Sequence, residues 1–305
     1  MKNFALIGAA GYIAPRHMQA IKETGHRLVA VADPADSVGV LDRYFLDVRY
    51  FPEIERFDRH LEKLRHGPEE NKVHFVSICS PNYLHDAHVR LALRSGCNAI
   101  CEKPLVINPW NLDQLAQVER ETGNKVNTIM QLRLHPTVIA LKEKLIAERT
   151  RQPDAPKKKV SLEYLTGRGP WYQQSWKGRE ERSGGLVTNI GIHFFDMLLW
   201  LFGEPEQMNV TVLTPTNARG TLSLKHADVT WHLSVDFGQL PFAAAPGQTT
   251  TYRSITIDGE ALDFTGGFTD LHTRSYEEIL NGNGFGIDDA RPAIELVHRI
   301  RQSQP

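Results

Sequence analysis

Apolar residues in the first 130 positions fall into short runs separated by longer segments with helical spacing. The short runs predict strands at residues 4–7, 28–32, 73–79, 98–101 and 126–130, and the longer segments predict helices at 12–24, 85–94 and 111–122. The strand runs are apolar throughout, as is typical of parallel strands covered on both faces. This alternation predicts an α/β fold, a Rossmann-type doubly wound parallel sheet.

The second half of the chain has a different pattern. Residues 229–237 alternate apolar with polar side chains, which predicts a strand with one buried face. Asp258-Gly259 is typical of a tight turn and predicts a hairpin between strands at 254–257 and 261–264. Further strands are expected at 160–166, 209–213 and 221–224 and a helix at 193–202, whereas the basic residues 157–159 are expected in a solvated loop. We predict a C-terminal α+β domain with an open, mainly antiparallel sheet.

The two patterns place the domain boundary near residues 130–135. We therefore expect a dinucleotide-binding domain over residues 1–132 and a substrate-binding and oligomerisation domain over 133–305. Both are within the usual size of a single domain.

Composition narrows the classes of partner. Lys and Arg total 35 against 36 for Asp and Glu, which argues against nucleic acid or an anionic membrane as the main partner. The three cysteines, Cys79, Cys97 and Cys101, match no zinc spacing and predict reduced thiols in a cytoplasmic protein. We expect no signal peptide and no membrane-spanning segment, because no apolar run approaches the required length.

A turn rich in small residues follows the first predicted strand. Gly8, Ala10 and Gly11, with Tyr12 and Ile13 after them, can bring the backbone and a helix N-terminus close to a pyrophosphate. The motif departs from G-x-G-x-x-G at Ala10 and is weak alone. Asp33 strengthens it, because an acid after the second strand binds ribose hydroxyls and repels a 2′-phosphate. We predict NAD rather than NADP; the alternative is an ordinary turn with a solvated Asp33.

Two residues are candidates for acid–base chemistry. Lys103 follows a predicted parallel strand, at the sheet edge where such folds bind ligands, and its ammonium can stabilise a developing alkoxide. His193 begins a predicted helix and can accept a hydroxyl proton near neutral pH. The alternatives are a surface lysine and a core histidine. Asp196 is expected to hold a neighbouring backbone group.

Three motifs together resemble the Gfo/Idh/MocA oxidoreductase family. They are Cys-Glu-Lys-Pro at 101–104, Pro-Asn-Tyr-Leu-His at 81–85, and the segment 185–196 with its Gly-x-His-x-x-Asp core. Segments 103–105, 175–178, 188–191 and 268–272 further resemble one subgroup, the bacterial UDP-N-acetyl-2-amino-2-deoxyglucuronate 3-dehydrogenases of surface-polysaccharide (O-antigen, lipopolysaccharide) synthesis. The likeness extends over essentially the whole chain.

The resemblance implies an NAD-dependent dehydrogenase that oxidises the 3-hydroxyl of a UDP-linked N-acetylated amino-sugar uronate, and a cytoplasmic homotetramer. It implies cofactor contacts from Ser80, Pro81, Asn82, His85, Glu102, Lys103 and Gln131 in addition to the turn residues and Asp33. Asn189 joins Lys103 and His193 as a catalytic residue, although many relatives carry Asp there. An amide cannot stabilise an imidazolium by charge, so His193 is expected to be less basic than in those relatives.

The segment 168–178 combines cations with aromatic rings. Arg168 and Lys177 can bind carboxylate or phosphate, and Trp171 and Tyr172 can cover a sugar or uracil ring. The alternative is a solvated loop with its tryptophans packed beneath it. With Lys103, Asn189 and His193, these four residues form the predicted substrate site.

No set of His, Asp and Glu residues has convincing metal-ligand spacing, and hydride transfer to NAD needs no metal, so no metal is predicted. His17, His88 and His135 are interpreted as packing or surface residues. Two other functions stay open: another sugar or inositol dehydrogenase of the same family, and a non-catalytic NAD-sensing regulator.

Overall fold

The chain divides into two compact units. The computed structural model describes residues 1–245, 247–262 and 270–304. Unit 1 comprises Met1–Gln131 and Thr269–Arg291, and unit 2 comprises Leu132–Phe268 and Pro292–Pro305. The chain therefore returns to unit 1 after it has formed the sheet of unit 2, and α10 (Ile287–Arg301) contributes to both units.

Unit 1 contains the predicted doubly wound parallel sheet. Its strands run in the order β3-β2-β1-β4-β5-β6, which is the arrangement typical of dinucleotide-binding folds. They are β1 (Asn3–Ile7), β2 (Arg27–Ala32), β3 (Arg49–Phe51), β4 (Phe75–Ile78), β5 (Asn98–Cys101) and β6 (Val126–Thr128). The five strands predicted from apolar runs are confirmed, with shorter ends for β4 and β6. All five residues of β1 are buried, as expected of a central strand covered on both faces.

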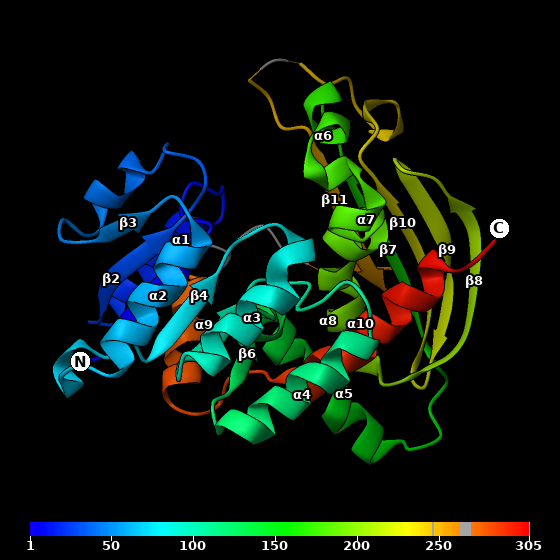
Figure 1. Ribbon diagram of the computed structural model, residues 1–305. Coiled ribbons are helices and arrows are strands. Elements are labelled where there is room, and N and C mark those ends of the chain that lie inside the picture. Colours follow the sequence, from blue (N-terminus) through cyan, green and yellow to red (C-terminus); the bar gives the residue numbers. More distant parts are fainter. Residues whose placement is uncertain (246, 263–269, 305) are drawn as a thin grey trace. The chain divides into compact units, whose positions relative to one another are not determined.

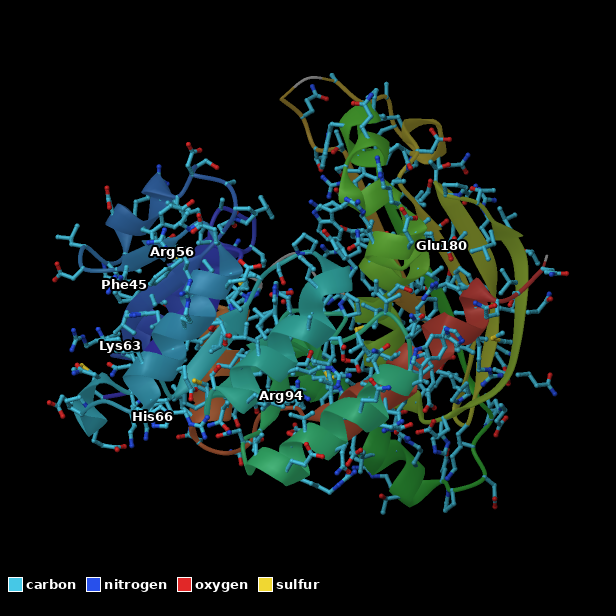
Figure 2. The ribbon with its side chains drawn as sticks, in the orientation of Figure 1. Phe45, Arg56, Lys63, His66, Arg94 and Glu180 are labelled. Atoms are coloured by element: carbon cyan, nitrogen blue, oxygen red, sulfur yellow. The ribbon has the colours of Figure 1, made fainter. Side chains whose placement is uncertain are left out.

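The helices of unit 1 include the three that the sequence predicted. They are α1 (Ala14–Glu23), α2 (Ile54–Arg65), α3 (His85–Arg94), α4 (Trp110–Thr122) and α9 (Leu271–Leu280), with α9 in contact with α1 (Figure 1). The apolar pattern gave no prediction for β3 and α2. Only Phe57 and Leu61 of α2 are buried, whereas charged side chains such as Arg56 and Lys63 lie on the surface (Figure 2).

Unit 2 is built on a mixed sheet in the order β12-β11-β7-β10-β9-β8. Its strands are β7 (Lys158–Thr166), β8 (Pro205–Leu213), β9 (Asn217–Leu224), β10 (Ala227–Ser234), β11 (Thr251–Ile257) and β12 (Glu260–Ala261). All pairs are antiparallel except β7 with β10, which confirms the mainly antiparallel prediction. The expected Asp258-Gly259 turn joins β11 to β12, and both residues have positive φ, 52° and 86°.

Two details of the prediction for unit 2 need correction, and a third lies partly outside the described residues. The strand predicted to end at residue 237 ends at Ser234, because Phe237 begins a 3₁₀ turn and its side chain is exposed. The basic residues were expected in a loop, but Lys158 and Lys159 begin β7, where Lys158 bridges to Glu148 and Asp258. The strand predicted at 261–264 is described only as far as residue 262; residues 263 and 264 lie outside the described residues.

The core of unit 2 lies between its sheet and α8 (Ile192–Phe202), the predicted helix. Phe195 is fully buried and meets Trp231 of β10 edge to face, with ring centroids 5.4 Å apart. A Cβ at Gly191 would lie 2.7 Å from the Cδ1 methyl of Leu233, so the helix approaches β10 closely at this glycine. Among the described residues, Glu180–Phe202 is one helical stretch with the length and composition of a membrane span, and most of it is buried inside the protein.

Candidate functional site

The parallel sheet of unit 1 collects the predicted cofactor residues at one edge. Gly8 directly follows β1, Asp33 follows β2, Ser80 lies two residues after β4, and Glu102 and Lys103 follow β5. Because parallel strands end at the same edge, these residues share the carboxyl-terminal edge of the sheet, where doubly wound folds bind their ligands. Gln131 opens the 3₁₀ turn that follows β6.

The turn after β1 packs against the end of β4. Gly8 has a φ of +92°, and a Cβ there would lie 2.6 Å from the carbonyl carbon of Cys79. At Gly11 a Cβ would lie 3.0 Å from the carbonyl oxygen of Gly8. A side chain at either position would fill this backbone cradle, which precedes α1 and suits the pyrophosphate of a dinucleotide. Ile13 is the N-cap of α1, and the Tyr12 side chain is exposed.

Asp33 braces the same turn. Its Oδ2 atom accepts a hydrogen bond of 2.9 Å from the Ala10 N–H, and its Oδ1 atom accepts one of 2.8 Å from the Ala35 N–H. The residue is 8% exposed. Each carboxylate oxygen has a second lone pair, so Asp33 can hold the turn and still accept hydrogen bonds from ribose hydroxyls.

His85 and Ser80 connect the end of β4 to the segment after β5. The buried His85 ring contacts two backbone carbonyl oxygens, Pro104 through Nδ1 at 2.7 Å and Ser80 through Nε2 at 2.8 Å. Burial lowers the pKa of His85, and the two carbonyl acceptors oppose this by favouring the protonated ring. The structure therefore places His85 as a clamp on the backbone next to Lys103. Pro81 caps a short 3₁₀ turn that begins at the buried Asn82.

The segment of unit 2 that carries the predicted catalytic residues contains an irregular helical turn. A π-helical turn, η6 (Val187–Gly191), leads directly into α8, and such turns are frequent at functional sites. Asn189 lies in this turn, and the half-buried His193 is the second residue of α8. The wide turn therefore sets the direction in which both side chains leave the helix.

Tyr172 holds Asn189. Tyr172 lies in α6 (Pro170–Gln174), and its hydroxyl oxygen accepts a hydrogen bond of 2.9 Å from Asn189 Nδ2. Both residues are buried, and burial raises the pKa of Tyr172 against the opposing effect of the Asn189 bond. The phenol is therefore neutral at physiological pH, and its O–H remains a donor. Sequence reasoning assigned Tyr172 a ring-stacking role and missed this contact.

Asp196 has a side-chain partner that the sequence did not reveal. Its carboxylate binds the Arg133 side chain in a buried bidentate pair, with Nε–Oδ2 and Nη2–Oδ1 distances of 3.0 and 2.7 Å. The sequence predicted a structural role for Asp196 but did not identify Arg133 as its partner. A planar guanidinium fits a carboxylate better than a single N–H does, and the pair satisfies both buried charges. It fixes α8 to the turn that contains Arg133.

The segment 168–178 gathers its cations around aromatic rings. Lys177 Nζ lies 4.8 Å from the Trp176 ring centre and 5.9 Å from that of Trp171, and Trp171 is 53% exposed. Burial, and then the charge of Arg168, lower the pKa of Lys177. Trp171 is therefore not packed beneath the loop, and the cluster offers an exposed ring beside two positive charges.

The structure also brings together residues that sequence reasoning separated. His17, Glu102 and His272 form a buried group that could hold a metal ion by residue type and proximity. His17 was interpreted as a packing residue, and no spacing along the chain links it to His272. The 268–272 motif was the available signal; its residues 268 and 269 lie outside the described residues.

Two family models match the chain. "Oxidoreductase family, NAD-binding Rossmann fold" matches residues 2–129, and "Oxidoreductase family, C-terminal alpha/beta domain" matches residues 158–260. Curated relatives are distant. Inositol 2-dehydrogenase of Rhizobium meliloti is 27% identical over 68% of the chain, and scyllo-inositol 2-dehydrogenase (NADP(+)) IolW of Bacillus subtilis is 25% identical over 63%. The matches span 57% and 49% of those proteins, about half their length.

Two solved structures are far more similar. Both are of the WlbA (WbpB) dehydrogenase from Thermus thermophilus, one with NAD and α-ketoglutarate and one with NAD and UDP-GlcNAcA. Each is 48% identical and covers 100% of this chain and 97% of the other, with TM-scores of 0.92 and 0.91. The WlbA dehydrogenase from Bordetella pertussis, at 18% identity over 99% of this chain and 96% of its own, shares the fold with a TM-score of 0.77.

Replacing Asp33 tests the cofactor edge. We expect Asp33→Ala to weaken NAD binding by about tenfold or more, the scale of one lost charge-assisted hydrogen bond, and to reduce the preference for NAD over NADP. Dissociation constants of both dinucleotides, measured by fluorescence titration, check this. Asp36→Ala, an exposed carboxylate on the same loop, is the control. Tighter binding of NADP than NAD by the unmodified protein would contradict the assignment.

Proposed function

Because the chain belongs to the Gfo/Idh/MocA oxidoreductase family, we propose that it is an NAD-dependent dehydrogenase that oxidises the 3-hydroxyl of a UDP-linked N-acetylated amino-sugar uronate. The observation that carries this proposal is the 48% identity, over the whole chain, to a dehydrogenase crystallised with NAD and UDP-GlcNAcA. Distant relatives that act on inositol share less than a third of their residues with it.

The cation–aromatic segment of unit 2 supports an anionic, ring-containing substrate. UDP-GlcNAcA carries a pyrophosphate, a carboxylate and three rings, which are the uracil, the ribose and the sugar. Arg168 and Lys177 supply charges for the anionic groups, and the exposed Trp171 supplies a face for a ring. Lowering of the Lys177 pKa by burial also fits a residue that receives an anion, because a partly desolvated ammonium gains most from a negative partner.

The proposed mechanism divides the work among three residues. His193 accepts the proton of the 3-hydroxyl, Lys103 stabilises the oxygen as it gains negative charge, and Asn189 orients the group that it contacts. NAD supplies the hydride-accepting ring. Asn189 is itself held by Tyr172 at 2.9 Å, so its amide has a fixed orientation. An amide in place of a carboxylate leaves His193 without a stabilising negative charge from this position.

Cofactor contacts are proposed from the sheet edge of unit 1. Gly8, Ala10, Gly11, Tyr12 and Ile13 face the pyrophosphate side, and Asp33 accepts from the ribose. The remaining proposed contacts are Ser80, Pro81, Asn82, His85, Glu102, Lys103 and Gln131. The proposed domains are residues 1–132 for the cofactor and 133–305 for substrate and assembly, except that residues 269–291 belong to unit 1.

Removing either catalytic side chain should stop turnover without stopping cofactor binding. We expect Lys103→Ala and His193→Ala each to lower kcat by about 10²-fold or more, the usual size of an acid–base contribution. NADH formation followed at 340 nm gives kcat, and NAD titration confirms an intact cofactor site. Near-normal turnover in one variant would remove that residue from the mechanism.

The substrate assignment is tested by comparing sugars. We expect kcat/KM to be much higher for UDP-GlcNAcA than for UDP-N-acetylglucosamine, which lacks the carboxylate. The value for UDP-GlcNAcA should also exceed the values for free inositol and free glucose. Arg168→Ala or Lys177→Ala should raise KM by about tenfold, because each loses a charge-assisted contact. Arg179→Ala, an exposed cation beside the same segment, is the control. Equal kcat/KM values with and without the carboxylate would contradict the uronate assignment. A higher kcat/KM for a free polyol would instead favour the alternative function, a sugar or inositol dehydrogenase of the same family.

We further propose a cytoplasmic homotetramer that serves bacterial surface-polysaccharide synthesis. The face of the unit 2 sheet opposite Trp231 carries short polar side chains such as Ser161, Thr221 and Thr230 around a shallow hollow. Such a surface can pack against a second sheet. Sedimentation at micromolar concentration should show a tetramer, and only monomer there would contradict the proposed assembly.

A further inference from the structure

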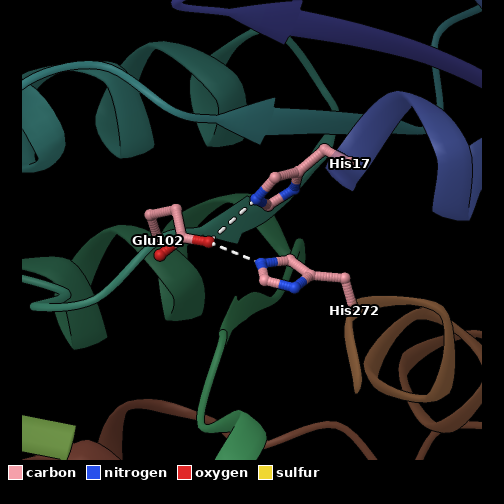
Figure 3. Close-up of side chains that lie close together, drawn as sticks. All are labelled: His17, Glu102 and His272. Carbon is pink, nitrogen blue, oxygen red and sulfur yellow. Dashed lines mark hydrogen bonds and ion pairs between the residues drawn. The ribbon is translucent and has the colours of Figure 1, made fainter. Parts of the chain in front are cut away.

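A buried carboxylate in unit 1 is held by two imidazoles (Figure 3). Oε1 of Glu102 lies 2.9 Å from Nε2 of His17 and 2.9 Å from Nε2 of His272. His17 is 0%, Glu102 6% and His272 5% exposed. We call these three residues the Glu102 cluster.

The hydrogen-bond pattern of the Glu102 cluster fixes its protons. Burial raises the pKa of Glu102, but the hydrogen bonds from the two imidazoles oppose this, and the pKa lies well below its usual value. As a carboxylate Glu102 only accepts, so both Nε2 atoms donate. Nδ1 of His17 lies 2.8 Å from the Tyr276 hydroxyl, which lies 2.5 Å from Ser77 Oγ. Burial lowers the pKa of His17, so its neutral ring accepts from Tyr276, which accepts from Ser77.

The Glu102 cluster joins three elements around the proposed catalytic lysine. His17 is in α1, which follows the pyrophosphate turn, and His272 is in the first turn of α9. Glu102 follows β5, and its second oxygen, Oε2, accepts a hydrogen bond of 3.2 Å from the Lys103 N–H. On the other side of Lys103, the Pro104 carbonyl is held by His85. The backbone of Lys103 is therefore fixed from both sides.

A purely stabilising role does not explain this arrangement well. Burying a carboxylate costs free energy, and well-packed apolar residues of similar volume are often as stable as a buried ion pair. A metal centre is also a poorer explanation, because 2.9 Å is the length of a direct N–H···O bond, and a zinc ion would occupy the space between the ligand atoms. What the carboxylate provides, and an apolar residue cannot, is a fixed acceptor for the Lys103 N–H.

We propose that Glu102, His17 and His272 are positioning residues, which fix the Lys103 backbone relative to α1 and so set where the lysine ammonium meets the reacting oxygen. None of the three acts on the reacting atoms in this assignment, and Glu102 remains a proposed cofactor contact. The proposal rests on the proposed dehydrogenase function for its kinetic readout only. Misplacement of a reacting group by a fraction of an ångström is enough to lower a rate while leaving ligand affinity unchanged.

Glu102→Gln is the sharpest single change. The glutamine oxygen can still accept from both imidazoles, but its NH₂ group then faces the Lys103 N–H, so donor meets donor. We expect kcat to fall by about tenfold or more, while KM for UDP-GlcNAcA stays within about threefold. Asn3→Ala, which removes two partly buried hydrogen bonds at the start of β1, is the matched control for general destabilisation of unit 1.

His272 offers a conservative rescue. His272→Leu keeps the bulk but removes the donor, and should lower kcat as Glu102→Gln does. His272→Gln places an amide N–H near the former Nε2 position and should restore kcat to within about threefold of the unmodified enzyme. Melting temperatures are measured in parallel. Asn3→Ala should lower the melting temperature and leave kcat unchanged, so it separates a loss of stability from a loss of kcat.

A measurement that needs no substrate turnover tests this proposal independently of the proposed function. The rate at which an amine-reactive reagent acylates Lys103, followed by mass spectrometry against exposed Lys144, should change at least threefold in Glu102→Gln, because the backbone that carries the ammonium loses its Oε2 acceptor and the lysine changes position. If the unmodified protein oxidises no UDP-sugar, the proposed function fails, and the acylation rate still tests the cluster. Unchanged acylation together with unchanged kcat in Glu102→Gln and His272→Leu would overturn it, as would a stoichiometric divalent metal in the purified protein.

Discussion

The parallel direction of the strands is the constraint on which the proposed chemistry of unit 1 depends. Each strand of a parallel sheet must be followed by a crossover that returns the chain to the opposite edge, so every strand ends on the same side. The ends of β1, β2, β4 and β5 therefore bring together Gly8, Asp33, Ser80 and Lys103, although these residues are spread over a third of the chain. The close approach of Gly8 to Cys79 shows how little space that edge leaves for side chains.

Three buried carboxylates show how the protein uses charge inside its core. Asp33 is satisfied by backbone N–H groups, Asp196 by a guanidinium, and Glu102 by two imidazoles and a backbone N–H. Each accepts two or more hydrogen bonds, as a desolvated anion requires. Each also lies next to a segment with a proposed role: the pyrophosphate turn, the helix of His193, and Lys103. Burial of these anions therefore serves orientation as much as stability.

Elements were predicted correctly from the sequence where apolar residues are concentrated, and they were missed where apolar residues are sparse. β1 and α8 were predicted to within a residue because nearly all their side chains are buried. α2 was missed because a helix needs only Phe57 and Leu61 to cover the sheet, and its other residues resemble a loop. Phe237 was predicted in a strand because the apolar–polar alternation continues to residue 237. The strand ends earlier, where Asp236 caps a 3₁₀ turn.

The amino-acid sequence by itself determined the two kinds of sheet, the pyrophosphate turn with Asp33, and the candidates Lys103 and His193, because periodicity and strand-end position are local properties. Only the tertiary structure decided that Asp196 binds Arg133, that Tyr172 holds Asn189, and that His17 meets His272 on Glu102. These partners are separated by 17 to 170 positions. Pairing between such side chains depends on which helices pack together, and no spacing along the chain records it.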